Sequence, residues 1–155
     1  MTLDLPYPWL EDEALQANFD RIRTEWPEPA SPWKPYTATV TTVTLGTGGT
    51  NVARYAKHGR TVHCHGCITL GTGGSLTGSP VEVALPLAAA AYPQVGVVTA
   101  NNVGTQLFPG VARIAASAST FKASFEGGAF LSATGPFTWG DTDVLTWQIT
   151  YETAV

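Results

Sequence analysis

Histidine and cysteine, the side chains best suited to bind a metal or exchange electrons, gather in one short stretch of this chain. The stretch His63-Cys-His-Gly-Cys67 holds both cysteines and two of the three histidines. Successive side chains of a β-strand point to opposite faces, so a strand here places His63, His65 and Cys67 on one face and Cys64 on the other. A structural zinc draws its ligands from two separated segments, which this stretch alone cannot supply.

Two interpretations of the histidine pair stay open. His58, across the turn at Gly59, is the remaining candidate ligand within one subunit, and three chains could each offer His63 and His65 to a metal on a symmetry axis. The alternative is two solvated or interface histidines beside a small buried Cys64. We assign no cofactor to the chain and keep His63 and His65 as the candidate metal ligands.

The spacing of Cys64 and Cys67 is also that of redox motifs, which sit at the N-terminus of a helix where the thiol pKa is lowered. Here both residues lie in an expected strand, with side chains on opposite faces. We therefore expect reduced thiols and no disulfide, as is usual for a protein made inside a cell.

Acid–base and nucleotide-binding machinery is missing from the pattern. Asp141 and Asp143 have the spacing of a catalytic pair, but they lie in a Gly-Asp-Thr-Asp turn, where aspartates usually bind the local backbone. The related stretches 44–50 and 69–75, both Thr-Leu-Gly-Thr-Gly-Gly-Thr/Ser, lack the lysine and the following helix of a phosphate-binding loop. We expect two glycine turns at one end of a sheet, and no enzyme.

Charged side chains are scarce and unevenly spread. They make up 13% of the 155 residues, about half the share of a typical soluble domain, and the net charge of −4 lies entirely within residues 1–34. The balanced remainder makes no basic footprint for nucleic acid. No apolar run approaches the roughly 20 residues of a membrane-spanning helix, and no secretory signal is visible. A weakly charged surface instead suggests burial in an assembly.

Residues 1–35 predict an attachment segment: an extended arm, a helix over residues 11–26 and a proline-rich linker. The helix carries one apolar seam at the spacing of a coiled coil: Leu15, Phe19, Ile22 and Trp26. The seam could pack on its own domain, on the same helix of other subunits, or in a groove of a partner. The arm carries four apolar residues for anchoring: Leu3, Leu5, Tyr7 and Trp9.

Residues 36–155 predict an all-β domain, a sandwich or barrel, because short strand-forming runs alternate with glycine-rich turns. The expected strands cover 37–45, 51–58, 61–70, 80–85, 96–101, 105–108, 111–116, 120–125 and 144–152. Alternation in the last strand places Trp147 and Tyr151 in the core. Four aromatic residues lie near expected loops: Tyr92, Phe108, Phe137 and Trp139. Aromatic faces can bind a sugar ring, but such residues are more often packing residues.

The order of several short motifs resembles a domain of tailed phages that infect Gram-positive hosts, the knob of minor tail, tail-fibre and head-fibre proteins. The matching motifs are Trp33-Lys-Pro-Tyr-Thr37, Leu45-Gly-Thr-Gly48, Ala53-Arg-Tyr55, Gly59-Arg-Thr-Val62, Thr69-Leu-Gly71, Val83-Ala-Leu-Pro86 and the closing strand over 145–152. The stretch 13–20 is similar to the short helix that leads into such knobs. The chain has no fibre shaft, which distinguishes it from longer members.

This resemblance implies a trimeric, jelly-roll-like β-sandwich on a virion surface, without catalysis. It would make the helical seam a three-helix contact and would hide uncharged surface between subunits. The expected role is a minor tail or fibre-type appendage involved in host adsorption, made in the host cytoplasm. The alternatives are a capsid decoration protein and a module that binds host glycans. The expected partners are its own copies and other virion proteins, with no nucleic acid and no membrane insertion.

Overall fold

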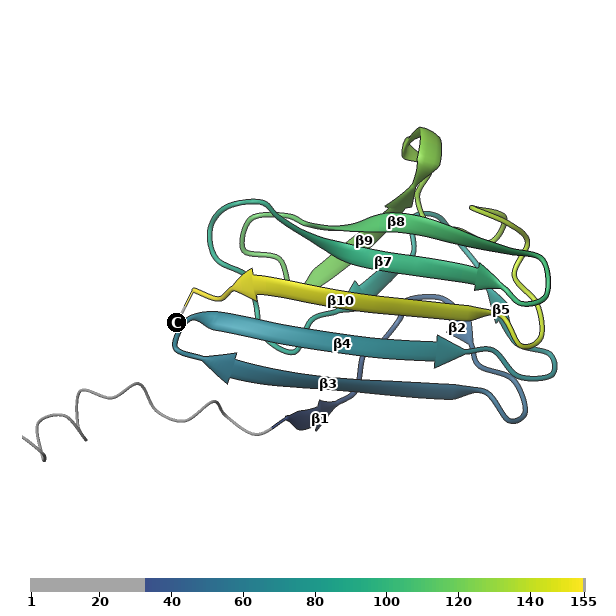
Figure 1. The fold of residues 1–155 in the computed structure, drawn as a ribbon, viewed down its shortest axis with the longest axis horizontal. Helices are drawn as coiled ribbons and strands as arrows, with labels where there is room; N and C mark the ends of the chain where they lie inside the picture. Colours follow the sequence, from purple (N-terminus) through teal and green to yellow (C-terminus); the bar gives the residue numbers. More distant parts are fainter. Residues whose placement is uncertain (1–32, 155) are drawn as a thin grey trace, which may run out of the picture.

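The computed structural model describes residues 33–154, and this part of the chain is built almost wholly of β-strands (Figure 1). The strands are β1 (Lys34–Tyr36), β2 (Val43–Thr44), β3 (Thr50–His58), β4 (Thr61–Thr69), β5 (Ser75–Leu76), β6 (Glu82–Ala84), β7 (Gln94–Asn102), β8 (Gln106–Ile114), β9 (Thr120–Phe125) and β10 (Val144–Glu152), with one 3-10 turn, η1 (Glu126–Gly128). The all-β prediction is confirmed for these residues. None of them forms a helix of the length and apolarity that crossing a membrane requires.

Eight strands form one antiparallel sheet in the order β1-β3-β4-β10-β7-β8-β9-β6, and β2 pairs with β5 in a small second sheet. Figure 1 shows β3, β4, β10 and β7 side by side along the molecule. The large sheet curls until its two ends meet through the segment that follows β1. There Val40 forms a bridge with Val83 of β6, and the Thr41 N–H donates to the Glu82 carbonyl over 2.9 Å.

Alternation of side chains fixes which face of the curled sheet is the core. In β10 the residues Leu145, Trp147, Ile149 and Tyr151 are buried, as the sequence predicts for Trp147 and Tyr151. The neighbouring β4 contributes Gly66 to the same face, and a Cβ atom there would overlap the Trp147 ring. The glycine within the histidine–cysteine stretch is therefore a packing residue that makes room for an indole.

The expected strand boundaries were wrong at three places. β8 runs unbroken through Pro109, where two strands were expected; β9 pairs with β8 only from Gly110 onward, so Pro109 lies where one side of β8 lacks a partner strand. The expected strand over 37–45 is reduced to β2 and a single bridge. The short strands β1 and β5 were not expected, because strands of two or three residues depend on tertiary pairing rather than local sequence.

The two repeated glycine stretches pair with each other, which goes beyond their expected role as turns. Thr47 and Thr72, which occupy equivalent positions in the repeats, each donate an N–H to the carbonyl of the other, over 2.9 and 3.0 Å. The loops continue into the β2–β5 pair. A Cβ atom on Gly71 would overlap the Thr47 carbonyl, so the close approach of the loops requires glycine. The repeat thus closes one end of the domain.

The predicted arm, helical seam and anchoring residues fall in residues 1–32 and lie outside the described residues. This applies to Leu3, Leu5, Tyr7 and Trp9 of the arm and to Leu15, Phe19, Ile22 and Trp26 of the seam.

Candidate functional site

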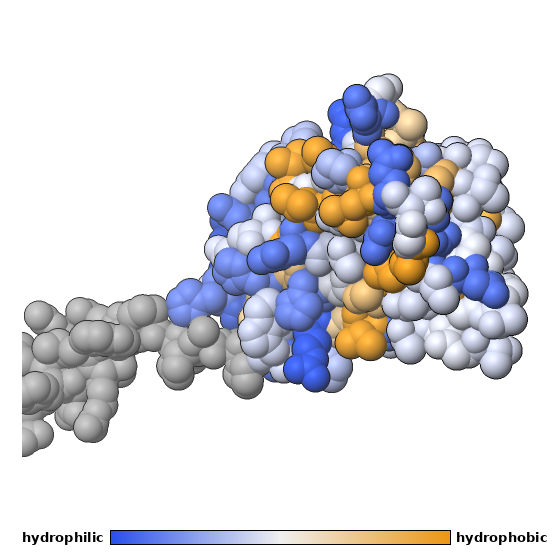
Figure 2. All heavy atoms as spheres, turned by 45° about the vertical axis from the view of Figure 1, so that its right-hand side comes forward, coloured by the Kyte–Doolittle hydropathy of each residue, from blue (hydrophilic) through white to orange (hydrophobic). Residues whose placement is uncertain are grey.

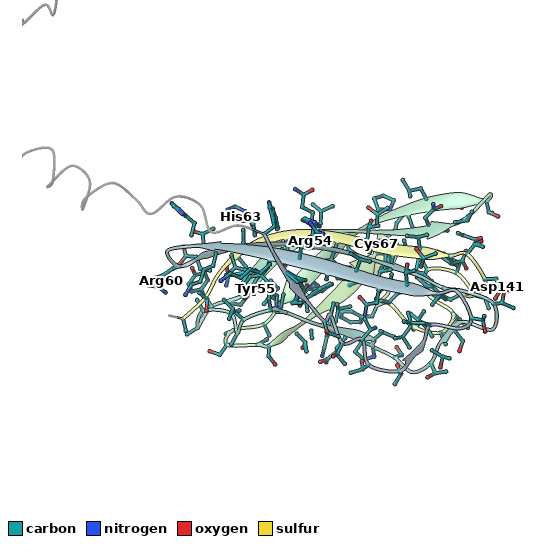
Figure 3. The ribbon with its side chains drawn as sticks, turned by 90° about the horizontal axis from the view of Figure 1, so that it is seen from below. Arg54, Tyr55, Arg60, His63, Cys67 and Asp141 are labelled. Atoms are coloured by element: carbon teal, nitrogen blue, oxygen red, sulfur yellow. The ribbon has the colours of Figure 1, made fainter. Side chains whose placement is uncertain are left out.

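The histidine–cysteine stretch forms most of β4, and its alternation is as predicted. His63 and His65 are exposed on the outer face of the sheet, whereas Cys64 points inward and is 1% exposed. Cys67 is half-buried on the outer face, and both thiols are free. Figure 3 shows His63 and Cys67 along this face, with Arg60 at the hairpin turn and Asp141 at the far end of the domain.

Each histidine of the pair already has a neighbour from another strand or segment. The His63 Nδ1 atom and the Thr150 hydroxyl of β10 are 2.9 Å apart. The His65 ring lies against the Trp33 indole, with ring centroids 4.5 Å apart, and Arg54 of β3 is its cross-strand partner. His58 pairs with Thr61 near the hairpin turn, away from this pair along the strands.

A metal site is not assembled by one chain within residues 33–154. These residues contain no group of three histidine, cysteine or acidic side chains arranged to hold a metal ion. His63 and His65 remain a pair of donors on an open surface, and a metal there would need further ligands from another chain. The arrangement of this face is better described by its charge.

Basic and histidine side chains are concentrated at one end of the sheet, which we call the basic edge. Its members lie on β1, β3, β4 and the turn between β3 and β4: Lys34, Arg54, Lys57, His58, Arg60, His63 and His65. The outer face carries Arg54 and the three histidines, whereas Lys34 and Lys57 pair with the inward-facing Tyr55 and Val62 and so project from the inner face of the same edge. Four of the six lysines and arginines in the described residues, and all three histidines, belong to it. The acid beside it is Glu152, whose carboxylate lies 3.9 Å from Arg60 in a largely exposed pair.

Sequence reasoning missed the basic edge because charges were counted over the whole β domain, where the signs balance. The signal was present: no aspartate or glutamate occurs between Glu28 and Glu82, and the segment between them carries these bases and histidines. Strand pairing then converts a run along the chain into a patch in space, since Arg54 lies opposite His65.

The other end of the same outer surface is apolar, and we call it the valine face. Its members are Val95, Val97, Leu107 and Val111, which are 68%, 62%, 59% and 45% exposed. Val97 of β7 is the cross-strand partner of Val111 of β8, so their side chains lie together. Figure 2 shows apolar side chains gathered in the middle and upper part of the molecule, with hydrophilic ones both above and below them.

The described surface is hollowed beside the valine face. One groove of about 560 Å³ is lined by Val95, Arg113, Lys122 and Phe130 among others. A smaller hollow of about 220 Å³ lies beside Phe108 and Pro136.

The aromatic residues considered for sugar binding are only partly brought together. Phe137 lies 5.2 Å from Phe108 and 4.5 Å from Trp139 between ring centroids, but Trp139 is buried. Tyr92 is not part of this group; it lies beside Glu152, and a hydrogen bond to that carboxylate raises the pKa of its hydroxyl. Phe108, which is half-buried, is therefore the ring of this group that lines the smaller hollow.

Under the basic edge lies a buried polar cluster that fastens β1 to the core. The Trp147 indole N–H donates to the Tyr36 hydroxyl over 3.3 Å, and Cys64 lies next to that hydroxyl. Burial raises the pKa of the Cys64 thiol from 9.0 to about 12, and burial also raises the pKa of Tyr36. The thiol is thus a neutral packing group and a poor nucleophile at ordinary pH.

Asp141 and Asp143 bind backbone, but the predicted local bond is made by Asp143 to Gly140, whereas their other partners are in distant loops. The Asp143 carboxylate is buried and accepts N–H groups from Gly140 over 2.7 Å and Val103 over 3.1 Å. Asp141 accepts the Gly73 N–H over 3.0 Å. Both side chains hold loops at one end of the domain, and neither is placed for proton transfer to a ligand.

No protein-family model, curated protein or solved structure matches this chain.

Proposed function

We propose that this chain is a non-enzymatic structural protein of a phage virion, a trimeric appendage of the minor tail or fibre type. In this proposal its β domain is a jelly-roll-like sandwich, and residues 1–35 attach and trimerise it. The observation that carries the assembly part of the proposal is the valine face. A contiguous group of exposed apolar side chains on a stable sheet marks a surface that another protein covers.

The chemistry around the valine face fits a contact between protein surfaces. The cores of such contacts are depleted in charge. The cross-strand neighbours of Val97 are Gln148 and Val111, both uncharged, whereas Val95 has the exposed Arg113 as its partner on β8. The phage assignment itself rests on the ordered motifs of the sequence. The all-β fold agrees with the fold class that those motifs imply. An apolar seam at Leu15, Phe19, Ile22 and Trp26 would supply the three-helix part of the contact, and Leu3, Leu5, Tyr7 and Trp9 the anchor.

The oligomeric state tests this proposal. We expect the full chain to be a trimer by light scattering, and Val97→Asp with Val111→Asp to weaken association at least tenfold, since each substitution places a charge in an apolar contact. Val52→Asp is the matched control, because Val52 is 58% exposed on β3, away from the valine face. A monomeric wild-type chain, or an unaffected double variant, would contradict the proposal.

The place on the virion is a further part of the proposal. A tail appendage is the first reading and a capsid decoration protein the second; the position of the gene beside the tape-measure gene or the major capsid gene distinguishes them. Host glycan binding is favoured by one feature, the hollow beside Phe108 and Pro136. A glycan array probed with the wild-type chain and with Phe108→Ala tests it, and identical or absent signals would count against it.

A further inference from the structure

We propose that the basic edge binds the acidic N-terminal segment of the chain, residues 11–28. This inference does not depend on the virion assignment. It joins two features of opposite sign: the patch on β1, β3 and β4, and a segment whose charges are mostly acidic. The segment contributes Glu11, Asp12, Glu13, Asp20, Glu25 and Glu28, against Arg21 and Arg23.

The acidic segment and the basic edge carry opposite charge. Residues 1–32 carry seven acids and two bases, whereas the described residues carry five acids and six bases. Four of those six bases lie on the basic edge: Arg54 on its outer face, Arg60 in the turn, and Lys34 and Lys57 on its inner face. Arg54 is exposed on the outer face, and the structure gives its guanidinium no hydrogen bond or ion pair within residues 33–154. An acidic partner would therefore meet an uncompensated cation at the centre of the patch.

The position of Trp33 brings the acidic segment close to the basic edge. The described chain begins at Trp33, which is 48% exposed and lies against the His65 ring on this same face. Trp33 therefore fixes the end of the acidic segment to the patch. Glu28 is five residues away, a distance of at most about 17 Å along an extended chain. Several acids of the segment are consequently within reach of Arg54 and His63.

Tethering favours the N-terminal segment over a free anionic ligand as the occupant of the basic edge. A tethered partner acts at an effective concentration of about a millimolar. Exposed charge pairs are individually weak, so a tethered segment can occupy the patch where a free anion at ordinary concentration would not. A phosphate polymer is the competing occupant, and it should bind better once the segment is neutralised.

Proteolysis of the full chain measures docking directly. Chymotrypsin cleavage after Phe19 should be slow at 50 mM salt, and Arg54→Glu should accelerate it roughly fivefold, because a repulsive charge then faces the segment. Salt at 500 mM should accelerate the wild type similarly through screening. Arg113→Glu is the control, since Arg113 is an exposed base on β8 outside the basic edge. Unchanged circular dichroism, with Arg54→Gln as a milder variant, establishes that the fold is intact.

Charge exchange and competition complete the test. Glu25→Arg with Glu28→Arg, added to Arg54→Glu, should restore slow cleavage. Polyphosphate should bind the double Glu25→Gln, Glu28→Gln variant several-fold more tightly than the wild type. The proposal is overturned if Arg54→Glu and Arg113→Glu cleave alike, or if polyphosphate binds both forms equally. Light scattering on the same samples reports trimerisation separately, so failure of docking is distinguishable from failure of assembly.

Discussion

Strands β3 and β4 present arginine and histidine to solvent, whereas β7 and β8 present valine and leucine on the same outer surface. The two regions flank β10, whose outer residues include the neutral Gln148 and Thr150. The register places Arg54, His65, Gln148, Val97 and Val111 in one row across the sheet. One scaffold therefore offers an ionic surface and an apolar surface on either side of β10, suited to partners of different chemistry.

On the inner face, β4 and β7 both pack closely against side chains of β10. The largest predicted loss of stability at neutral pH comes from disturbing this packing. Gly66 of β4 makes room for Trp147, and Gly96 of β7 makes room for Ile149. We expect Gly66→Ala to lower the free energy of unfolding by about 3 kcal/mol, because a rigid buried indole must move. Chemical denaturation measures this loss.

Gly96→Ala is the matched variant from the other region. A Cβ atom there would lie 2.6 Å from Ile149 Cγ1, at a half-buried position. Its cost should be smaller, about 1 kcal/mol, since an aliphatic side chain can shift. Equal costs would mean that the two sides of β10 are packed with the same tolerance.

These interior contacts also show what the sequence could and could not predict. Strict alternation in β4 and β10 was enough to place His63, Cys64, Trp147 and Tyr151 on their faces. Alternation says nothing about which strands become neighbours, so the closure at Val40 and Val83 and the pairing of Thr47 with Thr72 were not predicted. The basic edge was missed for a different reason: its bases and histidines follow one another in a segment without acids, but charge was counted over the whole β domain.

The inner side of the basic edge carries a buried thiol, Cys64, that should make the stability of the domain depend on pH. The Cys64 thiol stays protonated in the folded chain until about pH 12, whereas the unfolded thiol ionises near pH 9. A raised pKa contributes stability that is present below pH 9 and is lost as pH rises through 12. The contribution of Cys64 to the free energy of unfolding should therefore fall by about 3 kcal/mol between pH 8 and pH 11.

Two measurements assign this loss to Cys64. The Cys64→Ala variant should show a shallower decline between pH 9 and 10, because Tyr36 and Tyr151, whose pKa values are also raised by burial, add to the loss from about pH 10 upward. In the wild type at pH 8, iodoacetamide should label Cys67 well before Cys64, which is 1% exposed. Comparable labelling of both thiols would show that β4 opens readily and that its inner side is not a closed core.

The smallest change in stability is expected for Glu152→Gln, which tests the charge of the basic edge directly. Glu152 is the acid beside the basic edge, and its ion pair with Arg60 is 3.9 Å long and largely exposed. Glu152→Gln should alter the free energy of unfolding by less than about 0.5 kcal/mol. The same substitution makes the basic edge more positive, so it should slow chymotrypsin cleavage after Phe19 if the acidic segment lies there.

Glu126→Gln, on the exposed turn η1, is the matched control, because it removes one negative charge at a site away from the basic edge. It changes the net charge of the chain equally but lies next to β9 rather than β4. If both substitutions slow cleavage alike, the effect follows from overall charge and the basic edge has no local role. If only Glu152→Gln does so, the segregation of charge along this sheet directs the N-terminal segment to one end of it and leaves the valine face open to a separate partner.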